Sequence, residues 1–479
     1  MRLLLPLAGL IIGGVPNLLA QVANSLSPLV RSFVSVDAPV VALTHVQLID
    51  GTGGPIGNDQ TVVIANGKIQ AVGRSGAVEI PAGARVLDLA GHTVIPGFVG
   101  LHDHIVYETA NRINNLNFSG PRLYLAGGVT TIRTNGGSEP YSELSLKHEI
   151  EDGKLPGPRM HISGPHISGG GPWDLGIPGN RVLWFRFVKT PEEARRVVAY
   201  WTQEGADWFK LYTRITKAEA AAVVDEAHKH GAKVTGHLCS ITFREAAAIG
   251  MDNVDHGFLV NTDYDPLKQP DQCPMDYRAR LLTVDLNSDE VRATFRDMIA
   301  HHVAMTGTLA AFEPMVPGRP PEDPRVMDAL APEVKAEWLA ARNQRAISRD
   351  TTAAILFRKA QQYEVAFVKA GGLLASGEDP NNGNLPGFGD QRNYELYIEA
   401  GFTPAQTVQV MSANGAKVLG DADSLGTVTV GKLADLVVIK GDPVTRPVEI
   451  RKVVTVFKGG VGYDSAKLIE SVRGLAGIR

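Results

Sequence analysis

The sequence has no run of like charge that stands out: 47 Lys and Arg face 51 Asp and Glu, for a formal net charge of −4. It therefore gives no support for binding to nucleic acid or to an anionic membrane. Internal repeats and low-complexity stretches are also absent, which argues against a solenoid or a disordered chain. With 44% hydrophobic and 20% charged residues among 479, the composition is that of a soluble globular protein. The length allows one large domain and a smaller one.

Cysteine is scarce, since Cys239 and Cys273 are the only two. Two cysteines do not make the disulfide framework that holds small secreted domains together. They can form one bridge in an exported protein or remain two free thiols, and the sequence leaves both possibilities open.

The start of the chain lacks the apolar length of a membrane-spanning helix. Arg2 precedes an apolar run over residues 3–12, and a Leu-Leu-Ala stretch ends at Ala20. The run is too short to cross a bilayer. A short positive region, an apolar core and a small residue before Gln21 are typical of a secretory signal peptide, here over residues 1–20. Its cleavage predicts a periplasmic or secreted protein without a stable membrane span. An uncleaved anchor or a misassigned start codon is the alternative.

Short strand patterns occupy both ends of the chain. Between residues 40 and 94, apolar runs alternate with turns, and Asn66-Gly67 between two such runs is a good hairpin signal. A similar pattern returns near the end of the sequence. We predict that residues 36–94 and 425–465 pack together as one small β-sandwich domain that is discontinuous in sequence.

The middle of the chain, residues 95–424, alternates apolar runs with amphipathic segments. Strand–helix alternation repeated eight times predicts an α/β fold, a parallel (β/α)8 TIM barrel, rather than an antiparallel sandwich. The connection before the last strand, over about 313–370, is long and predicts an inserted lid or interface. The eight strand candidates are Phe98–His104, Thr130–Thr134, Met160–Gly164, Trp208–Tyr212, Lys233–Leu238, Asn253–Gly257, Val303–Leu309 and Leu373–Asp379.

His102 and His104 end the first of these strands. Residues two apart on a strand share a face, so both imidazoles are expected to point into the barrel while Asp103 points away. Imidazole nitrogens are common ligands of zinc and similar metals. Such a pair also occurs on purely structural strands, but active sites of this fold sit at the carboxyl ends of the strands. The position therefore favours a metal site.

Four other strand ends carry residues suited to the same site: Lys210, His237, His256 and Asp379. A lone buried Lys is unfavourable unless paired or neutralised, and its ammonium group has no lone pair for a metal. Reaction with CO2 would turn it into an anionic carbamate that can bridge two cations. Singly, each residue has a structural explanation: an ion-paired Lys, core histidines, or an Asp in the turn before Pro380. Their agreement at separate strand ends favours a metal centre with Asp379 as proton carrier.

These motifs resemble the amidohydrolase superfamily, and most closely its prolidase-like and imidazolonepropionase-like branch. The similarity covers nearly everything from about residue 40 to 465, and it implies a binuclear centre, usually of zinc. It also implies that carbamylated Lys210 bridges the two divalent metal ions. The motifs are Pro96-Gly97 before His102-Asp103-His104, Gly205-Ala206-Asp207 before Lys210, Gly236-His237, Asp255-His256-Gly257 and Gly377-Glu378-Asp379.

Two positions depart from the family pattern. Glu378 stands where the family often has Thr, and Thr134 follows Arg133 where many relatives have Asp. Neither residue is a predicted ligand, but both can alter the pocket.

For function, the expectation is hydrolysis of an amide C–N bond in a small-molecule substrate such as a dipeptide or an N-acyl amino acid. A hydroxide that bridges the metals would attack the carbonyl group, and Asp379 would pass a proton to the leaving amine. We expect three further residues to contact the substrate. Tyr212 shares the face of Lys210 farther out, His166 sits in a Gly-rich loop, and Arg133 can receive a carboxylate. A packing tyrosine and a structural ion pair of Arg133 are the alternatives.

Other activities use a similar site. A cyclic-amide hydrolase or a mononuclear deaminase, a lactonase and a phosphotriesterase-like enzyme are the alternatives among enzymes. Lys210 counts against a mononuclear centre. A catalytically silent relative is the alternative outside catalysis, although such proteins usually lose ligands. The oligomeric state stays open, a homo-oligomer included.

Overall fold

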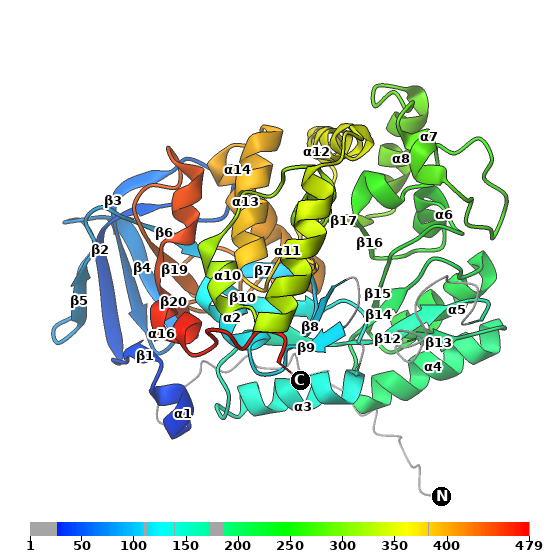
Figure 1. The fold of residues 1–479 in the computed structure, drawn as a ribbon. Coiled ribbons are helices and arrows are strands. Elements are labelled where there is room, and N and C mark those ends of the chain that lie inside the picture. Colours follow the sequence, from blue (N-terminus) through cyan, green and yellow to red (C-terminus); the bar gives the residue numbers. More distant parts are fainter. Residues whose placement is uncertain (1–25, 110–112, 138, 172–184, 382, 479) are drawn as a thin grey trace, which may run out of the picture.

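The computed structural model describes residues 26–109, 113–137, 139–171, 185–381 and 383–478. The predicted signal peptide over residues 1–20 lies outside the described residues. Within these ranges, no helix combines the length and the apolar character needed to cross a bilayer. Figure 1 shows a mixed α/β fold, in which a sheet built from both ends of the chain stands beside a larger region of parallel strands and helices.

The sheet at the chain ends has nine strands. They are β1 (Val34–Val36), β2 (Val40–Leu48), β3 (Gly57–Ala65), β4 (Lys68–Arg74), β5 (Arg85–Asp88), β6 (His92–Pro96), β19 (Leu436–Lys440), β20 (Val453–Lys458) and β21 (Val461–Asp464). Their order is β1-β21-β20-β19-β6-β2-β3-β4, with β5 paired to β2. The two ends of the chain therefore share one hydrogen-bonded sheet, drawn in blue and red in Figure 1. A sandwich of two facing layers stays a prediction.

The turn between β3 and β4 is the hairpin that the sequence predicts. The two strands pair in antiparallel fashion, with Ala65 opposite Lys68. Asn66 and Gly67 between them have φ angles of 51° and 73°, in the left-handed region that a two-residue turn requires. Asparagine and glycine adopt this region more readily than other residues, which explains why this dipeptide marks the turn.

Each of the eight predicted central runs contains a strand. The strands are β7 (Phe98–Asp103), β10 (Val129–Thr134), β11 (Arg159–His161), β12 (Ser163–Ser168), β14 (Trp208–Leu211), β15 (Lys233–Gly236), β16 (Asn253–Asp255), β17 (Ala304–Gly307) and β18 (Leu374–Ser376), and β13 (Phe185–Phe187) joins them beside β12. They form three sheets in the orders β11-β10-β7, β13-β12-β14-β15 and β16-β17-β18. Every pairing within these sheets is parallel, as predicted.

Helices follow most of these strands. Standard caps define several of them: Thr216 and Glu219 form a capping box at the start of α5, and Gly205 ends α4 with a φ of 108°. The helices are α1 (Pro28–Arg31), α2 (Gly120–Gly127), α3 (Pro140–Glu151), α4 (Pro191–Glu204), α5 (Lys217–Lys229), α6 (Phe243–Ala248), α7 (Tyr277–Leu281), α8 (Asp289–Ala300), α9 (Leu309–Phe312), α10 (Pro324–Ala329), α11 (Pro332–Ala346), α12 (Thr352–Lys369), α13 (Phe388–Ala400), α14 (Pro404–Met411), α15 (Ala413–Leu419) and α16 (Ser465–Glu470).

The insertion before β18 is helical and comprises α10, α11 and α12. It reaches a short hairpin of β8 (Val106–Glu108) and β9 (Ile113–Asn115), which follows the first central strand. The Thr109 hydroxyl donates a 2.7 Å hydrogen bond to Glu337 of α11. The insertion therefore packs beside the segment that follows His102 and His104. Its use as a lid or an interface stays a prediction.

The two cysteines form a disulfide. Cys239 lies in the loop after β15, two residues beyond His237, and Cys273 lies shortly before α7. The bond ties together two loops that follow neighbouring central strands.

His161, at the end of β11, joins two distant segments: the residue before β14 and the loop after α15. Its Nδ1 lies 2.6 Å from Asp207 and its Nε2 lies 3.0 Å from Asp421. Burial alone would lower the pKa of His161, but the two carboxylates outweigh it and raise the pKa to about 9. The charged ring therefore stabilises the fold.

This raised pKa predicts a pH-dependent stability. The contribution of His161 should be complete below about pH 6.5, the pKa of an unfolded histidine, and should be lost as the pH rises through about 9. His161→Gln should lower the free energy of unfolding at pH 6 by on the order of 3 kcal/mol and by much less at pH 10. Urea unfolding across this range measures it, with exposed His301→Gln as the control. Parallel curves for wild type and His161→Gln would contradict the prediction.

Candidate metal centre

His102 and His104 stand at the end of β7, as predicted, with ring centroids 5.3 Å apart. His102 is buried, and the His104 side chain is 14% exposed. Asp103 between them turns to the opposite face, where its Oδ1 accepts a 3.2 Å hydrogen bond from the backbone N–H of Glu378. Strand alternation thus places the two imidazoles on one side and the intervening carboxylate on the other.

His256 and Asp379 reach the same place through an unusual backbone. Their φ angles are 64° and 53°, in the left-handed region that residues with a Cβ rarely adopt. Such positions concentrate at functional sites, where the surrounding structure holds the strained backbone. Gly377 allows the close approach: a Cβ there would lie 2.3 Å from the backbone nitrogen of His102. The Asp379 N–H also donates a 2.8 Å hydrogen bond to the His102 carbonyl group.

Imidazole nitrogens of three histidines lie close to Asp379. Its Oδ2 lies 3.7 Å from His102 Nε2 and 3.9 Å from His256 Nδ1, and its Oδ1 lies 3.6 Å from His104 Nε2. One ligand atom from each of His102, His256 and Asp379 lies within 4.8 Å of the others. The His237 ring follows β15 and lies 4.5 Å, centroid to centroid, from the His256 ring. All four predicted histidines and the aspartate therefore surround one space.

Lys210 of β14 is buried behind this cluster, and its Nζ donates a hydrogen bond to Asp255. Asp255 is completely buried and accepts two more hydrogen bonds on the same oxygen, from Thr235 at 2.9 Å and from Asn135 at 3.1 Å. Burial opposes ionisation of Asp255, but the charge of Lys210, the contact with His102 and the charge of Arg133 outweigh it and hold the pKa of this carboxyl group well below its usual range. Asp255 is therefore the anion that compensates Lys210 inside the protein.

Two polar side chains position the histidines from behind. The amide nitrogen of Asn135 lies 2.6 Å from His102 Nδ1. The hydroxyl group of Thr308 lies 2.8 Å from His256 Nδ1. Hydrogen-bonding partners of this kind fix the orientation of an imidazole and decide which of its nitrogens is free to bind a metal.

The imidazoles of the cluster are held in the neutral form that a metal requires. Burial is the main cause, and it lowers the pKa of His102, His237 and His256 well below the usual value and that of His104 to about 3. Burial and the nearby charge of Glu108 raise the pKa of Asp379 to about 7.

His166 and Tyr212 lie beside the cluster, as expected for residues at its mouth. The His166 ring centroid is 6.3 Å from that of His104, and the Tyr212 ring is 5.1 Å from that of His237. The two rings also contact one another at 5.5 Å, and Phe185 packs against both at 4.9 Å. An aromatic wall therefore flanks the histidines on this side.

Arg133 does not have the placement of a substrate contact. Its side chain is fully buried, and its guanidinium donates to Asn135 at 3.2 Å and to Asp255 at 3.3 Å. It also lies over the Trp208 ring, 4.4 Å from the centroid. The structure thus corrects the expectation in favour of its alternative: Arg133 is a structural ion-pair residue beneath the cluster.

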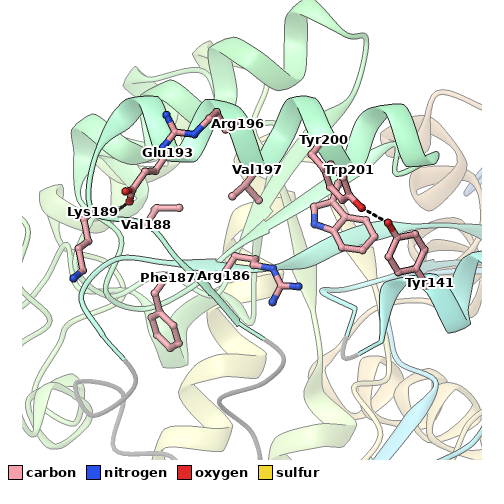
Figure 2. Close-up of a pocket in the computed structure, with 10 residues that line it drawn as sticks. All are labelled: Tyr141, Arg186, Phe187, Val188, Lys189, Glu193, Arg196, Val197, Tyr200 and Trp201. Atoms are coloured by element: carbon pink, nitrogen blue, oxygen red, sulfur yellow. Dashed lines mark hydrogen bonds between the residues drawn. The ribbon is translucent and has the colours of Figure 1, made fainter.

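A separate cavity lies away from these residues. Its volume is about 620 Å³. Figure 2 shows the side chains that line it, from α3, α4 and the end of β13, with Tyr141 and Tyr200 hydrogen-bonded to each other. Arg186, Lys189 and Trp201 also line it, and none of the predicted metal ligands does. The hollow is distinct from the histidine cluster.

A solved structure of a Xaa-Pro dipeptidase with bound methionine in its active site has the same fold. It superposes with a TM-score of 0.67 and 22% identity, over 89% of this chain and all of that chain. In sequence, 104 residues are 35% identical to a dihydroorotase of Anaeromyxobacter dehalogenans, covering 22% of this chain and 23% of that protein. An alignment of 399 residues with an imidazolonepropionase of Pseudomonas putida is 23% identical and covers 79% of this chain and 87% of that protein.

Residues 388–462 match the model of the Amidohydrolase family. The match covers 75 of the 479 residues, so it shows a likeness to this family over the last part of the chain. The matched segment begins at α13, directly after the loop that carries Asp379, and ends in β21 of the shared sheet. The family model therefore covers the last part of this chain, while the histidines and Lys210 precede it. The chain spans about a quarter of the length of the dihydroorotase that it matches.

Sequence reasoning missed the residues that support the histidine cluster. Asp255 precedes His256 in a motif that was noted for its histidine alone. Asn135 and Thr308 each follow a strand end by one residue, a position that would have singled them out. Arg278, whose guanidinium carbon lies 6.0 Å from the centroid of the Phe312 ring, gave no signal because it lies on α7 rather than at a strand end.

The buried partnership of Asp255 predicts a large loss of stability on its removal. Asp255→Asn keeps the shape but leaves Lys210 and Arg133 without their anion, so the metal-stripped protein should lose about 3–5 kcal/mol of unfolding free energy. Asp225→Asn is the matched control, because Asp225 is exposed and pairs with Lys229 at 3.0 Å on the surface. It should lose less than about 1 kcal/mol. Equal losses in urea unfolding would show that Asp255 does not carry this role.

Proposed function

We propose that the protein is a metal-dependent hydrolase that cleaves an amide C–N bond of a small substrate, such as a dipeptide or an N-acyl amino acid. The observation that carries the proposal is the convergence of His102, His104, His256 and Asp379, with His237 and buried Lys210 beside them. The match of residues 388–462 to the Amidohydrolase family model supports the same reaction class.

We also infer that the three parallel sheets close into one (β/α)8 barrel. Backbone hydrogen bonds link their edges: Asp252 N–H donates to Val234 across β15 and β16, and Asp379 N–H donates to His102 across the ends of β18 and β7. The likeness to the dipeptidase structure supports this closure.

The donor set fits divalent metals. Neutral imidazoles and a carboxylate are the ligands that zinc prefers, and the cluster offers both within a few ångströms. We propose that two divalent ions, zinc in the first place, are held by His102, His104, His237, His256 and Asp379. Lys210 would complete the set as a carbamate, because an ammonium group cannot donate a lone pair.

When bound, such ions supply a hydroxide nucleophile at neutral pH and polarise the substrate carbonyl group. The side chains provide the rest. Asp379, with its side chain 24% exposed, is the cluster residue placed to take a proton from water and return it to the leaving nitrogen. Tyr212 and His166 flank the reacting bond and exclude water from one side.

Hydrolysis of a cyclic amide is the second candidate. The alignments with a dihydroorotase and an imidazolonepropionase favour keeping it beside the first. A lactonase or a phosphotriesterase-like activity would use the same ligands, but no observation favours either one.

Export remains part of the proposal. The apolar run over residues 3–12 has the pattern of a signal peptide, and disulfides such as that of Cys239 with Cys273 persist mainly in oxidising compartments. We therefore propose a periplasmic or secreted location.

Metal analysis with a substrate panel tests the reaction. The purified protein should contain close to two divalent ions per chain, and the loaded enzyme should cleave dipeptides or N-acyl amino acids. The panel includes cyclic amides, lactones and phosphotriesters, assayed with the metal-loaded and the chelator-treated protein. One ion or none would overturn the binuclear centre, and turnover confined to another substrate class would overturn the amide proposal.

Lys210→Ala should reduce both metal content and turnover, the latter by more than about 100-fold, because the bridging ligand is lost. Short carboxylic acids such as acetate should restore part of the activity by supplying the missing oxygens. Lys229→Ala, on the exposed surface, serves as the control. Full activity and two ions in Lys210→Ala would remove the bridging role.

A further inference from the structure

Arg278 brings a positive charge to the histidine cluster from outside the central strands. It lies on α7, and its guanidinium carbon is 6.0 Å from the centroid of the Phe312 ring. That ring in turn lies 5.4 Å from the His256 ring in an edge-to-face contact. The charge of Arg278 also acts on His237 and His256. The guanidinium is therefore close to the side of the cluster that His256 and Phe312 form.

The segment that presents Arg278 is fixed at several points. The Arg278 Nε and the Tyr277 hydroxyl each donate a 3.3 Å hydrogen bond to the carbonyl group of Leu259, three residues after His256. The disulfide of Cys239 with Cys273 ties the beginning of the same segment to the loop that carries His237. A guanidinium held in place loses less conformational entropy when it binds a ligand than one on a free loop.

The guanidinium keeps donors for a ligand. Within the described part of the chain, no carboxylate lies within 4.0 Å of it, and its one hydrogen bond there uses Nε. Its neighbour Arg280 differs, because it is bound by both oxygens of Asp265 at 2.7 and 2.5 Å. Arg133 differs as well, because it is buried beneath the cluster on Asp255. Arg278 is half-buried, so its charge is partly shielded from water but still accessible.

We propose that Arg278 binds the free carboxylate of the substrate, so that the enzyme selects amides whose amine side ends in a carboxylate. A guanidinium binds a carboxylate through two parallel charge-assisted hydrogen bonds, which fixes orientation as well as adding affinity. The Phe312 ring between Arg278 and His256 gives the side chain of the same amino acid an apolar surface. The assignment rests on the proposed amide hydrolysis and narrows its substrate class.

The kinetic test compares each substrate of the panel in two forms. One form has a free carboxyl group on its amine side, and in the other this carboxyl group is converted to a primary amide. Arg278→Met should lower kcat/KM for the free acids by about 10- to 100-fold, mainly through KM, and should leave the primary amides nearly unchanged. Arg278→Lys should retain part of the preference, since it keeps the charge without the fork. Arg296→Met, an exposed arginine on α8, removes the same charge elsewhere and should match wild type. Equal losses for acids and amides in Arg278→Met would overturn the assignment.

A binding measurement separates this assignment from the reaction itself. Calorimetry on the metal-stripped protein should show N-acetyl-L-methionine binding at least about 10-fold tighter than N-acetyl-L-methioninamide, with the preference lost in Arg278→Met. If no amide of the panel is cleaved but this preference holds, the proposed reaction fails and the carboxylate site stands. If wild type binds both compounds equally, the carboxylate site fails whatever the reaction is.

Discussion

The charge of Asp255, buried without access to water, is the constraint on which the centre of this protein depends. One carboxylate meets the ammonium group of Lys210, the guanidinium of Arg133, and the polar groups of Asn135 and Thr235. Each of these cations would be strongly destabilising at its position without an anion. Asn135 contacts both Asp255 and His102. The Asp255 carboxylate therefore also holds in place the side chain that orients a candidate metal ligand.

Charge compensation and backbone strain act together at the cluster. His256 and Asp379 both have left-handed backbones, so the chain turns sharply where each strand ends and aims the side chain at the common space. The supporting bonds come from behind: Thr308 contacts His256, and the backbone of His102 binds that of Asp379. The local strain is therefore held by neighbours rather than relieved by a glycine.

The strand alternation and the ends of the central strands could be predicted from the sequence, because both follow from periodicity and from local turn residues. The placement of Asp103 away from His102 is a direct result of that alternation. The role of Arg133 could not be predicted in the same way. Its partner Asp255 is 122 residues away in sequence, and only the folded structure shows that the two side chains form a buried ion pair. The position of Arg278 could not be predicted, because this residue lies on the short helix α7, away from the strand ends that carry the other candidates.

The arrangement of the terminal sheet affects how the chain must assemble. β6 hydrogen-bonds to β2 on one side and to β19 on the other, yet about 340 residues separate it from β19. During synthesis, one edge of β6 stays unpaired until nearly the whole central region has left the ribosome. Contacts of such long range slow folding, and an open apolar edge invites pairing with other chains. The last strands of the protein thus close an edge that its first strands leave exposed.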